Sequence, residues 1–182
     1  SMGIRPDRVK YRATSERSIL ASILTRLSID ASSIQIRHAK QDSNGRYLST
    51  MNSGLNNCLT VEANLDQAAS AFRQDIFMTL FDEGVIAIVP TDVDTAPKET
   101  GGYDIKQLRV GKIIDWEPQH VRISVYNEQT ARREELRFPK RFVAIVENPL
   151  YAVMNEPNST LQRLIRKLNL LDAVDEASSS GK

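Results

Sequence analysis

The chain of 182 residues has little of several features that would identify a function directly. Cys58 is its one cysteine, so no disulfide can close within a single copy; this fits a reducing compartment without proving one. Lys and Arg total 24 against 23 for Asp and Glu, and a chain so balanced lacks the strongly basic face of a dedicated duplex-DNA binder. No apolar run approaches the roughly 18 residues of a membrane-spanning helix.

What the sequence does have is the composition of an ordinary soluble domain, with 41% hydrophobic and 26% charged residues. The length suffices for one core and a small appended lobe. Residues 1–13 are basic and have no apolar periodicity, so we expect a loose, flexible arm, with Ser1-Met2 as a remnant of cloning. No internal repeat is visible at periods of roughly 20–50 residues.

Helical periodicity predicts the first element. A helix should begin near Thr14 or Ser15 and end near Leu27, with a buried stripe made of Ile19, Leu20, Ile23, Leu24 and Leu27. Alternating apolar residues over 34–39 then indicate a strand. The Asn44-Gly45 pair is typical of a hairpin turn, after which residues 47–50 should return as a second short strand.

A second helix is expected between an irregular stretch, residues 51–63, and a glycine. Asn64 and Gln67 have the spacing of a capping box, so this helix should run over about 66–82 and end at Gly84. Its core side should carry Ala69, Phe72, Ile76 and Leu80. The next stretch, 85–89, is apolar throughout, which predicts a strand buried on both faces.

The second half of the chain is predicted to be β-rich. Residues 91–104 are rich in Pro, Gly and charge, which predicts a loop. Strands are expected over 106–116, 119–126, 134–138 and 142–146, with a hairpin turn near 127–130. The fold class is therefore α+β, with helices packed on a mostly antiparallel sheet and a helical segment at the C-terminus. We divide the chain into the arm 1–13, a domain 14–147, and a Pro-punctuated linker with the helical segment, 148–182.

The stretch NPLYAVMNEPNSTLQRLIRKLNLLD, residues 148–172, is a punctuated junction that leads into a helix. Pro157 forces extended backbone just before it, and Ser159 with Gln162 forms a capping box for the helix beyond. The apolar face of this helix would consist of Leu161, Leu164, Ile165 and Leu168. Basic residues precede acidic ones here, against the helix macrodipole, so the helix either breaks near Asn169 or continues past Lys182.

The sequence offers only weak candidates for chemistry. Cys58 and His38 could act as nucleophile and base only in contact and with a third orienting group, of which there is no local sign; a lone cysteine is more often a small buried apolar residue. His120 suits a strand start. Asp92 and Asp94 have the spacing of alternate calcium ligands, but the loop glycine and closing glutamate are missing. We therefore expect no catalytic, cofactor-binding or metal site, and no enzyme.

Basic doublets at residues 132–133 and 140–141 flank a predicted strand and could meet phosphates. Glu134 and Glu135 lie between the doublets, so a solvated, self-paired hairpin is the favoured interpretation. Aromatic residues on the strands raise the alternative of base stacking, but that arrangement needs a basic groove. Core packing is favoured for these aromatics: Trp116, Tyr126, Phe138 and Phe142.

The stretch 148–172, together with SGLNNCLTVEANLDQAASAFRQDIFMTLFDEGVIAIVP (residues 53–90), resembles the N-terminal half of tailed-bacteriophage portal proteins. In this family of head-tail connectors an extended segment leads into a helix, the helix leads into a strand through an acidic-Gly turn, and a Pro-Asn-Ser-Thr helix start lies further on. The resemblance covers about residues 15–180. It rests on the order of elements and on local sequence, without a catalytic motif, so it transfers no functional residue.

The resemblance implies a structural subunit of a phage or prophage portal ring, with the elements here mainly in its outer wing. In the family a dodecameric ring sits at one capsid vertex, and double-stranded DNA is packaged and ejected through its channel with transient, non-specific contact. The ring docks terminase, capsid and head-completion or tail proteins, in the virion and, during assembly, in the host bacterial cytoplasm. This chain is short for the stem, clip and crown together, so ring closure by this piece alone stays open.

Two further classes remain open on the sequence. The first is a monomeric α+β binding module for nucleic acid or a protein partner, with the basic doublets as its binding groups. The second is a cysteine hydrolase built around Cys58, which has the weakest support because no orienting group is identifiable. The balanced charge favours the portal class over the nucleic-acid module.

Overall fold

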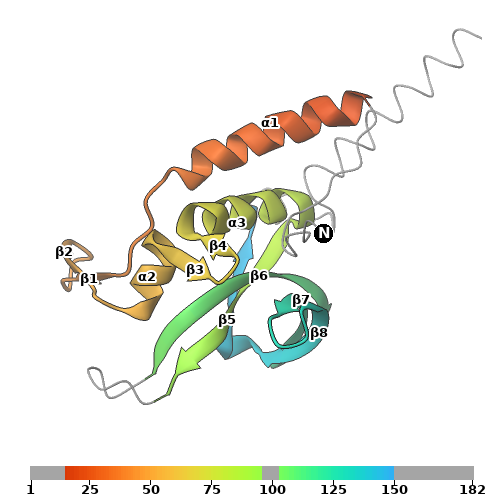
Figure 1. Cartoon of the computed structure of the whole chain (residues 1–182). Coiled ribbons are helices and arrows are strands. Elements are labelled where there is room, and N and C mark those ends of the chain that lie inside the picture. The colour runs from red at the N-terminus through yellow and green to blue at the C-terminus, as the bar shows by residue number, and fades with distance from the viewer. Residues whose placement is uncertain (1–14, 96–102, 150–182) are drawn as a thin grey trace, which may run out of the picture.

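The computed structural model describes residues 15–95 and 103–149. The expected arm 1–13, residues 96–102 of the predicted loop, and the predicted C-terminal helix with its expected break near Asn169 lie outside these residues. The described part is α+β, as the sequence predicts (Figure 1). Its helices are α1 (Ser15–Ser32), α2 (Gly54–Thr60) and α3 (Ala69–Glu83). Its strands are β1 (Ala39–Gln41), β2 (Tyr47–Thr50), β3 (Glu62–Asn64), β4 (Gln67–Ala68), β5 (Val85–Asp94), β6 (Asp104–Trp116), β7 (His120–Asn127), β8 (Arg132–Pro139) and β9 (Ala144–Glu147).

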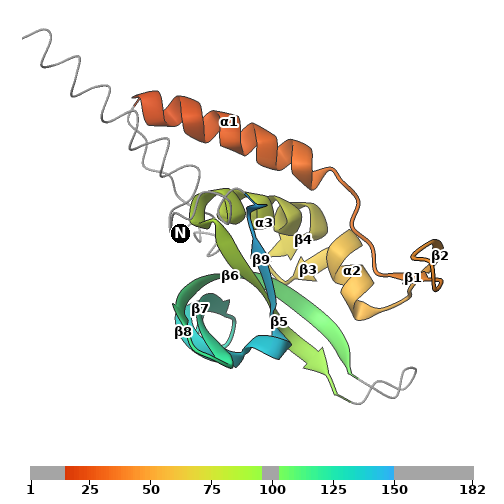
Figure 2. The same ribbon diagram turned by 180° about the vertical axis from the view of Figure 1, so that it is seen from behind.

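The main sheet is antiparallel, with the strand order β8-β7-β6-β5-β9. A 3₁₀ turn, Lys140–Phe142, precedes β9, which returns to pair with β5 in the register Ile86↔Val146. The sheet curls strongly, so that β7 and β8 wrap around one side of β5 and β6 (Figures 1 and 2). We refer to the curled sheet of β5 to β9 as the barrel; such an arrangement of strands does not by itself decide a function.

β5 and β6 separate two hydrophobic cores. The inner core, enclosed by the curl, consists of Ala87, Val89, Val121, Ile123 and Val125. The outer core lies between the sheet and the helices α2 and α3, and consists of Cys58, Ala63, Phe72, Ile76, Ile86, Leu108 and Val110. Alternate residues of β5 therefore enter different cores. The prediction that residues 85–89 are buried on both faces is confirmed, with Ile88 partly buried.

The core side and the end of α3 are also as predicted. Phe72 and Ile76 are buried and Leu80 packs against them. Gly84 ends the helix in the left-handed conformation, at φ 79°, and its N–H donates to the Leu80 carbonyl oxygen at 2.9 Å. The chain can then reverse directly into β5.

The predicted capping box at the start of α3 is wrong. Asn64 and Gln67 form the tight turn between β3 and β4, and the helix begins at Ala69 without a side-chain cap. Asn64 Oδ1 accepts a hydrogen bond from the Asp66 N–H at 2.9 Å, and its Nδ2 donates to the Leu108 carbonyl oxygen at 2.9 Å. An Asn-x-x-Gln spacing suits an Asx turn as well as a cap, and the contact with β6 selects the turn.

The stretch 51–63, predicted to be irregular, contains helix α2 and strand β3. Ser53 is the N-cap of α2, because its Oγ accepts from the Asn56 N–H at 3.1 Å. The Gly54 N–H donates to Asp104 Oδ1 on β6 at 2.9 Å. Asparagine and glycine disfavour a helix locally, and contacts with the sheet outweigh that preference here.

The first predicted strand is displaced. Residues 34–38 form no strand, and β1 begins at Ala39, where β2 lies opposite in the register Ala39↔Thr50. Alternation over 34–39 therefore does not by itself predict a paired strand, because the ladder begins only where β2 lies opposite. The predicted turn and return strand are confirmed: Asp42 Oδ1 accepts from the backbone N–H groups of Asn44 and Arg46, Gly45 has φ 78°, and β2 covers 47–50.

The predicted loop over 91–104 is shorter than expected. β5 continues to Asp94, which pairs opposite Asp104, the first residue of β6. Asp92 and Asp94 consequently lie on a strand and not in a loop. The other strands of the second half are confirmed with small shifts at their ends, as is the hairpin turn between β7 and β8.

The predicted buried stripe of α1 is mostly wrong. α1 extends to Ser32, and the side that faces α3 carries Leu24, 6% exposed, and Ser28, 0% exposed. Ser28 Oγ donates to the Leu24 carbonyl oxygen at 2.8 Å, which satisfies the hydroxyl within the helix. Most of the predicted stripe instead faces solvent: Ile19 is 62% exposed, Ile23 50% and Leu27 48%. Periodicity reveals an apolar stripe but not which neighbour covers it.

We predict that Gly54→Ala lowers the free energy of unfolding by at least ~1–3 kcal/mol, because the added methyl group would overlap the backbone carbonyl of Ile105. Urea denaturation followed by circular dichroism measures this. Gly45→Ala is the control: space around Gly45 is open, and the cost should be ~1 kcal/mol from its positive φ alone. Equal losses in the two variants would contradict the close approach of α2 to β6.

Candidate functional site

Cys58 and His38, the suggested nucleophile and base, form hydrogen bonds with different partners. Cys58 is completely buried, and its Sγ donates to the Lys106 carbonyl oxygen at 3.3 Å. Burial, and secondarily the nearby Asp104 carboxylate, raise the pKa of this thiol, so it stays protonated near neutral pH. The His38 ring contacts Ser53 Oγ through Nδ1 at 2.7 Å, at the start of α2. Cys58 is therefore a core residue, as favoured from the sequence.

Asp92 and Asp94 form no part of a metal site in the described ranges, where no group of three or more His, Cys, Asp and Glu residues is arranged to hold an ion. His120 is the first residue of β7, as predicted. Among residues 15–95 and 103–149, no helix is both long and apolar enough to cross a bilayer.

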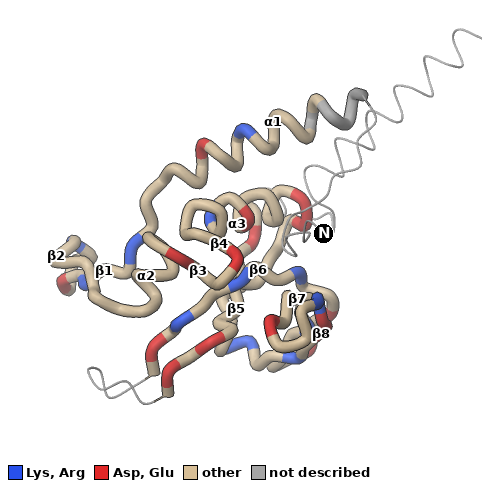
Figure 3. Tube along the Cα trace, viewed as in Figure 1, with Lys and Arg blue, Asp and Glu red and all other residues tan. Residues whose placement is uncertain are grey.

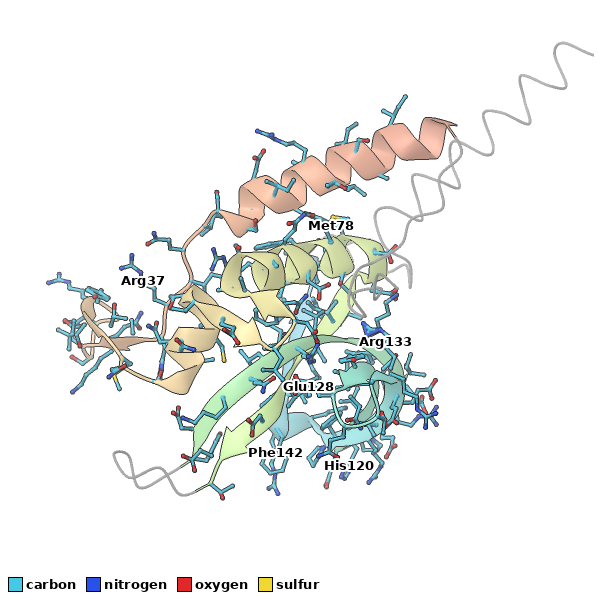
Figure 4. The ribbon with its side chains drawn as sticks, viewed as in Figure 1. Arg37, Met78, His120, Glu128, Arg133 and Phe142 are labelled. Atoms are coloured by element: carbon cyan, nitrogen blue, oxygen red, sulfur yellow. The ribbon has the colours of Figure 1, made fainter. Side chains whose placement is uncertain are left out.

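The basic doublets do not converge. They lie at opposite ends of β8, a strand of eight residues, and so stand ~25 Å apart; Figure 4 shows Arg133 towards the helices, with His120 and Phe142 at the far end of the barrel. Charges of both signs lie along this hairpin (Figure 3). Several are paired: Arg132 with Glu134 at 3.2 Å, Arg122 with Glu135 at 3.1 Å, and Arg137 with Glu117 at 2.7 Å. A self-paired hairpin was the favoured interpretation.

The aromatic residues divide into two pairs. Phe138 packs on the inner core and Tyr126 is partly buried, as predicted. Trp116 is 49% exposed and Phe142 55% exposed, so core packing was the wrong prediction for both. Lys140 Nζ lies 5.5 Å from the Trp116 ring centroid, and the Arg141 guanidinium 5.0 Å from that of Phe142. These contacts form a small aromatic–cation shelf, at the barrel end that carries the 3₁₀ turn.

The most strongly built polar arrangement was missed from the sequence. Arg109, in the middle of β6, is completely buried. Its Nη2 atom lies 2.7 Å from Asp66 Oδ2 in the β3–β4 turn and 2.6 Å from Glu128 Oε1 in the β7–β8 turn. Its guanidinium also lies 4.7 Å from the Tyr126 ring centroid. The available signal was an arginine between Leu108 and Val110, within an apolar run that had to be buried.

A pocket of about 370 Å³ opens beside this arrangement. Its walls come from the second half of β5, from Gln107 on β6, and from the β7–β8 hairpin. Glu128, labelled in Figure 4, contributes to the wall as well as to the pair with Arg109. The lining residues are Pro90, Thr91, Asp92, Gln107, Val125, Tyr126, Asn127, Glu128, Gln129, Leu136 and Phe138.

The outer side of α1 is the second candidate surface. Ile19, Ile23 and Leu27 follow one another at a spacing of four residues and so share one face. Between residues 19 and 32 the charged residues are Arg26 and Asp30, which pair at 3.3 Å; Figure 3 shows the coloured part of this helix as mostly uncharged. We refer to Ile19, Ile23 and Leu27 as the α1 stripe.

The chain matches no protein-family model, and no curated protein is similar to it in sequence.

We predict that Arg109→Met lowers the free energy of unfolding by ~1–3 kcal/mol, because it leaves two carboxylates without their shared cation. Asp66 and Glu128 keep 34% and 29% of their side-chain surface exposed, so water compensates part of the loss. Urea denaturation measures the effect. Adding Asp66→Asn and Glu128→Gln to Arg109→Met should restore part of the stability; a triple variant less stable than the single one would contradict this account.

The end of α3 gives a pH-dependent prediction. Burial, and next the Glu83 carboxylate, raise the pKa of Asp82, although Lys112 opposes them. A carboxyl whose pKa is higher folded than unfolded destabilises the protein as the pH rises through that interval. Asp82→Asn should therefore be more stable than the natural sequence at pH 7, with ~0.3–1 kcal/mol from removing a negative charge at a helix C-terminus.

The advantage of Asp82→Asn should shrink as the pH falls and vanish near pH 3, about one unit below the ordinary pKa of aspartate, where the carboxyl is protonated in both states. Thermal unfolding across this pH range measures it, with the exposed Glu62→Gln as the control. A constant difference at all pH values would show that the charge of Asp82 is not responsible.

Proposed function

We propose that this chain is a structural subunit of a phage or prophage portal ring, and that the α1 stripe contacts a neighbouring copy. The observation that carries the proposal is the stripe itself: three large aliphatic side chains on one helix face, each about half exposed or more. A helix that completed its packing within one domain would turn such a stripe inward. Its exposure is typical of a protein that finishes burying its surface on assembly.

The resemblance to portal proteins suggests that the assembly is a ring. A ring needs head-to-tail contacts between two different surfaces of each copy. The α1 stripe provides one surface. For the other we propose the apolar face of the helix that the sequence predicts after Pro157, with Leu161, Leu164, Ile165 and Leu168 at helical spacing. A dodecameric ring at a capsid vertex, docked to terminase, capsid and tail proteins, is the arrangement that the family implies.

The charge distribution is compatible with a channel wall or wing that DNA passes. Basic residues of the barrel are paired with acids along β7 and β8, and such exposed pairs leave little net field to hold phosphates. Weak, transient contact with double-stranded DNA is what a passage requires. The proposed place of action is the virion and, before that, the cytoplasm of the bacterial host.

The test is self-association of the full-length polypeptide, measured by gel filtration with light scattering and by electron micrographs. We predict rings or large oligomers for the natural sequence, and a shift towards monomer for Ile23→Lys, because a charge would be buried in the contact. Ser22→Lys is the matched control, an exposed neighbour on α1 that receives the same lysine. A natural sequence that stays monomeric at high concentration would overturn the proposal.

The aromatic–cation shelf favours a second candidate, a monomeric module that binds nucleic acid or a protein partner. Exposed Trp116 and Phe142 with cations on their faces form the kind of surface on which bases stack. Titration with single-stranded and duplex DNA distinguishes the two functions. Micromolar affinity with a steep salt dependence would favour the module, and the double variant Lys140→Ala, Arg141→Ala should then lose this binding. Weak binding that is insensitive to salt would favour the portal subunit.

A further inference from the structure

The pocket beside Arg109 is lined by both polar and apolar side chains. Neither of the two functions proposed above involves this pocket. Its volume of about 370 Å³ is near the lower end of ligand pockets and too small for a helix or a nucleotide strand. It can hold one long side chain or a small organic molecule. The walls belong to β5, β6 and the β7–β8 hairpin, and Arg109 ties β6 to the turn of this hairpin through Glu128.

The charge of the lining selects the sign of the ligand. Asp92 and Glu128 are its ionisable acids, and the residues that line the pocket include no Lys, Arg or His. Glu128 is paired with Arg109, which lies outside the lining, so Asp92 is the acid that would repel an anion and attract a cation. The Arg109 guanidinium, 2.6 Å from Glu128 Oε1, fixes this acid in the wall.

One residue of the pocket wall, Gln107, carries an acceptor without a partner. Gln107 Oε1 is buried and has no hydrogen-bond partner within the described part of the chain. A buried carbonyl oxygen without a donor is costly, so a ligand that brings an N–H group would be favoured there. The apolar wall formed by Val125, Leu136 and Phe138 suits the methylene stem of such a ligand.

We propose that this pocket binds an ammonium or guanidinium group carried on an aliphatic stem. The N–H groups donate to Gln107 Oε1 and to the Asp92 carboxylate, and the stem lies against Val125 and Phe138. The shared chemistry has two sources: a free alkyl amine or guanidine, or a Lys or Arg side chain from a polypeptide. Within this sequence the basic residues 1–13, with Arg5, Arg8, Lys10 and Arg12, offer such side chains. The proposal does not depend on ring formation.

The test uses the full chain and amide chemical shifts of the pocket residues. N-butylguanidinium and a peptide of residues 3–13 are titrated separately, with butyrate and butanol as the anionic and neutral comparisons. Saturable shifts with N-butylguanidinium support the site, and tighter binding of the peptide identifies a side chain as the source. Shifts with the small cation but not with the peptide support the site with a free amine as the source.

Asp92→Asn should weaken binding of N-butylguanidinium about tenfold, since it removes a charge-assisted hydrogen bond. Asp94→Asn is the matched control: it removes an acid from the same strand at a position outside the lining. No saturable shift with either cation, equal binding of butanol, or equal weakening by Asp92→Asn and Asp94→Asn would each overturn the proposal. Asp92 is exposed, so its variant should fold normally.

Discussion

A buried arginine holds the parts of this protein together. Arg109 is withdrawn completely from water on β6, and its charge is matched by Asp66 from the helical side and Glu128 from the barrel side. Burying a guanidinium is costly unless its partners are fixed in place. The two turns that carry these acids are therefore held relative to β6 and to each other. The pocket, which shares Glu128 with this pair, takes its shape from the same constraint.

The main sheet divides the interior of the protein into two hydrophobic cores, because both of its faces are covered. Alternate side chains of β5 and β6 enter the barrel or the helical layer, so both cores depend on the same pair of strands. α1 is attached less completely. Leu24 and the small Ser28 make its buried side, and Arg73 Nε donates to the Ser32 carbonyl oxygen at 2.8 Å where the helix ends. Its large aliphatic side chains are left outside this packing.

That incomplete burial links the structure to the proposed assembly. Covering the exposed parts of Ile19, Ile23 and Leu27 would contribute ~1 kcal/mol each, a modest sum for one contact. A closed ring repeats the contact around its circumference, so modest contacts suffice. The barrel contrasts with the α1 stripe. Its charged side chains pair with one another, so its surface has little net attraction for phosphates.

The sequence by itself determined the α+β class, the strands of the second half, the Asn44-Gly45 turn, the stop at Gly84 and the double burial of residues 85–89. Each follows from local periodicity or from a backbone conformation that few residues adopt. Only the tertiary structure decided what lies against each surface. It turned the α1 stripe outward, made a turn of Asn64 and Gln67, formed α2 against β6, and gave Arg109 two acids from distant turns. Periodicity specifies that a face is apolar or a residue buried, whereas its partner is set by chain segments far away in sequence.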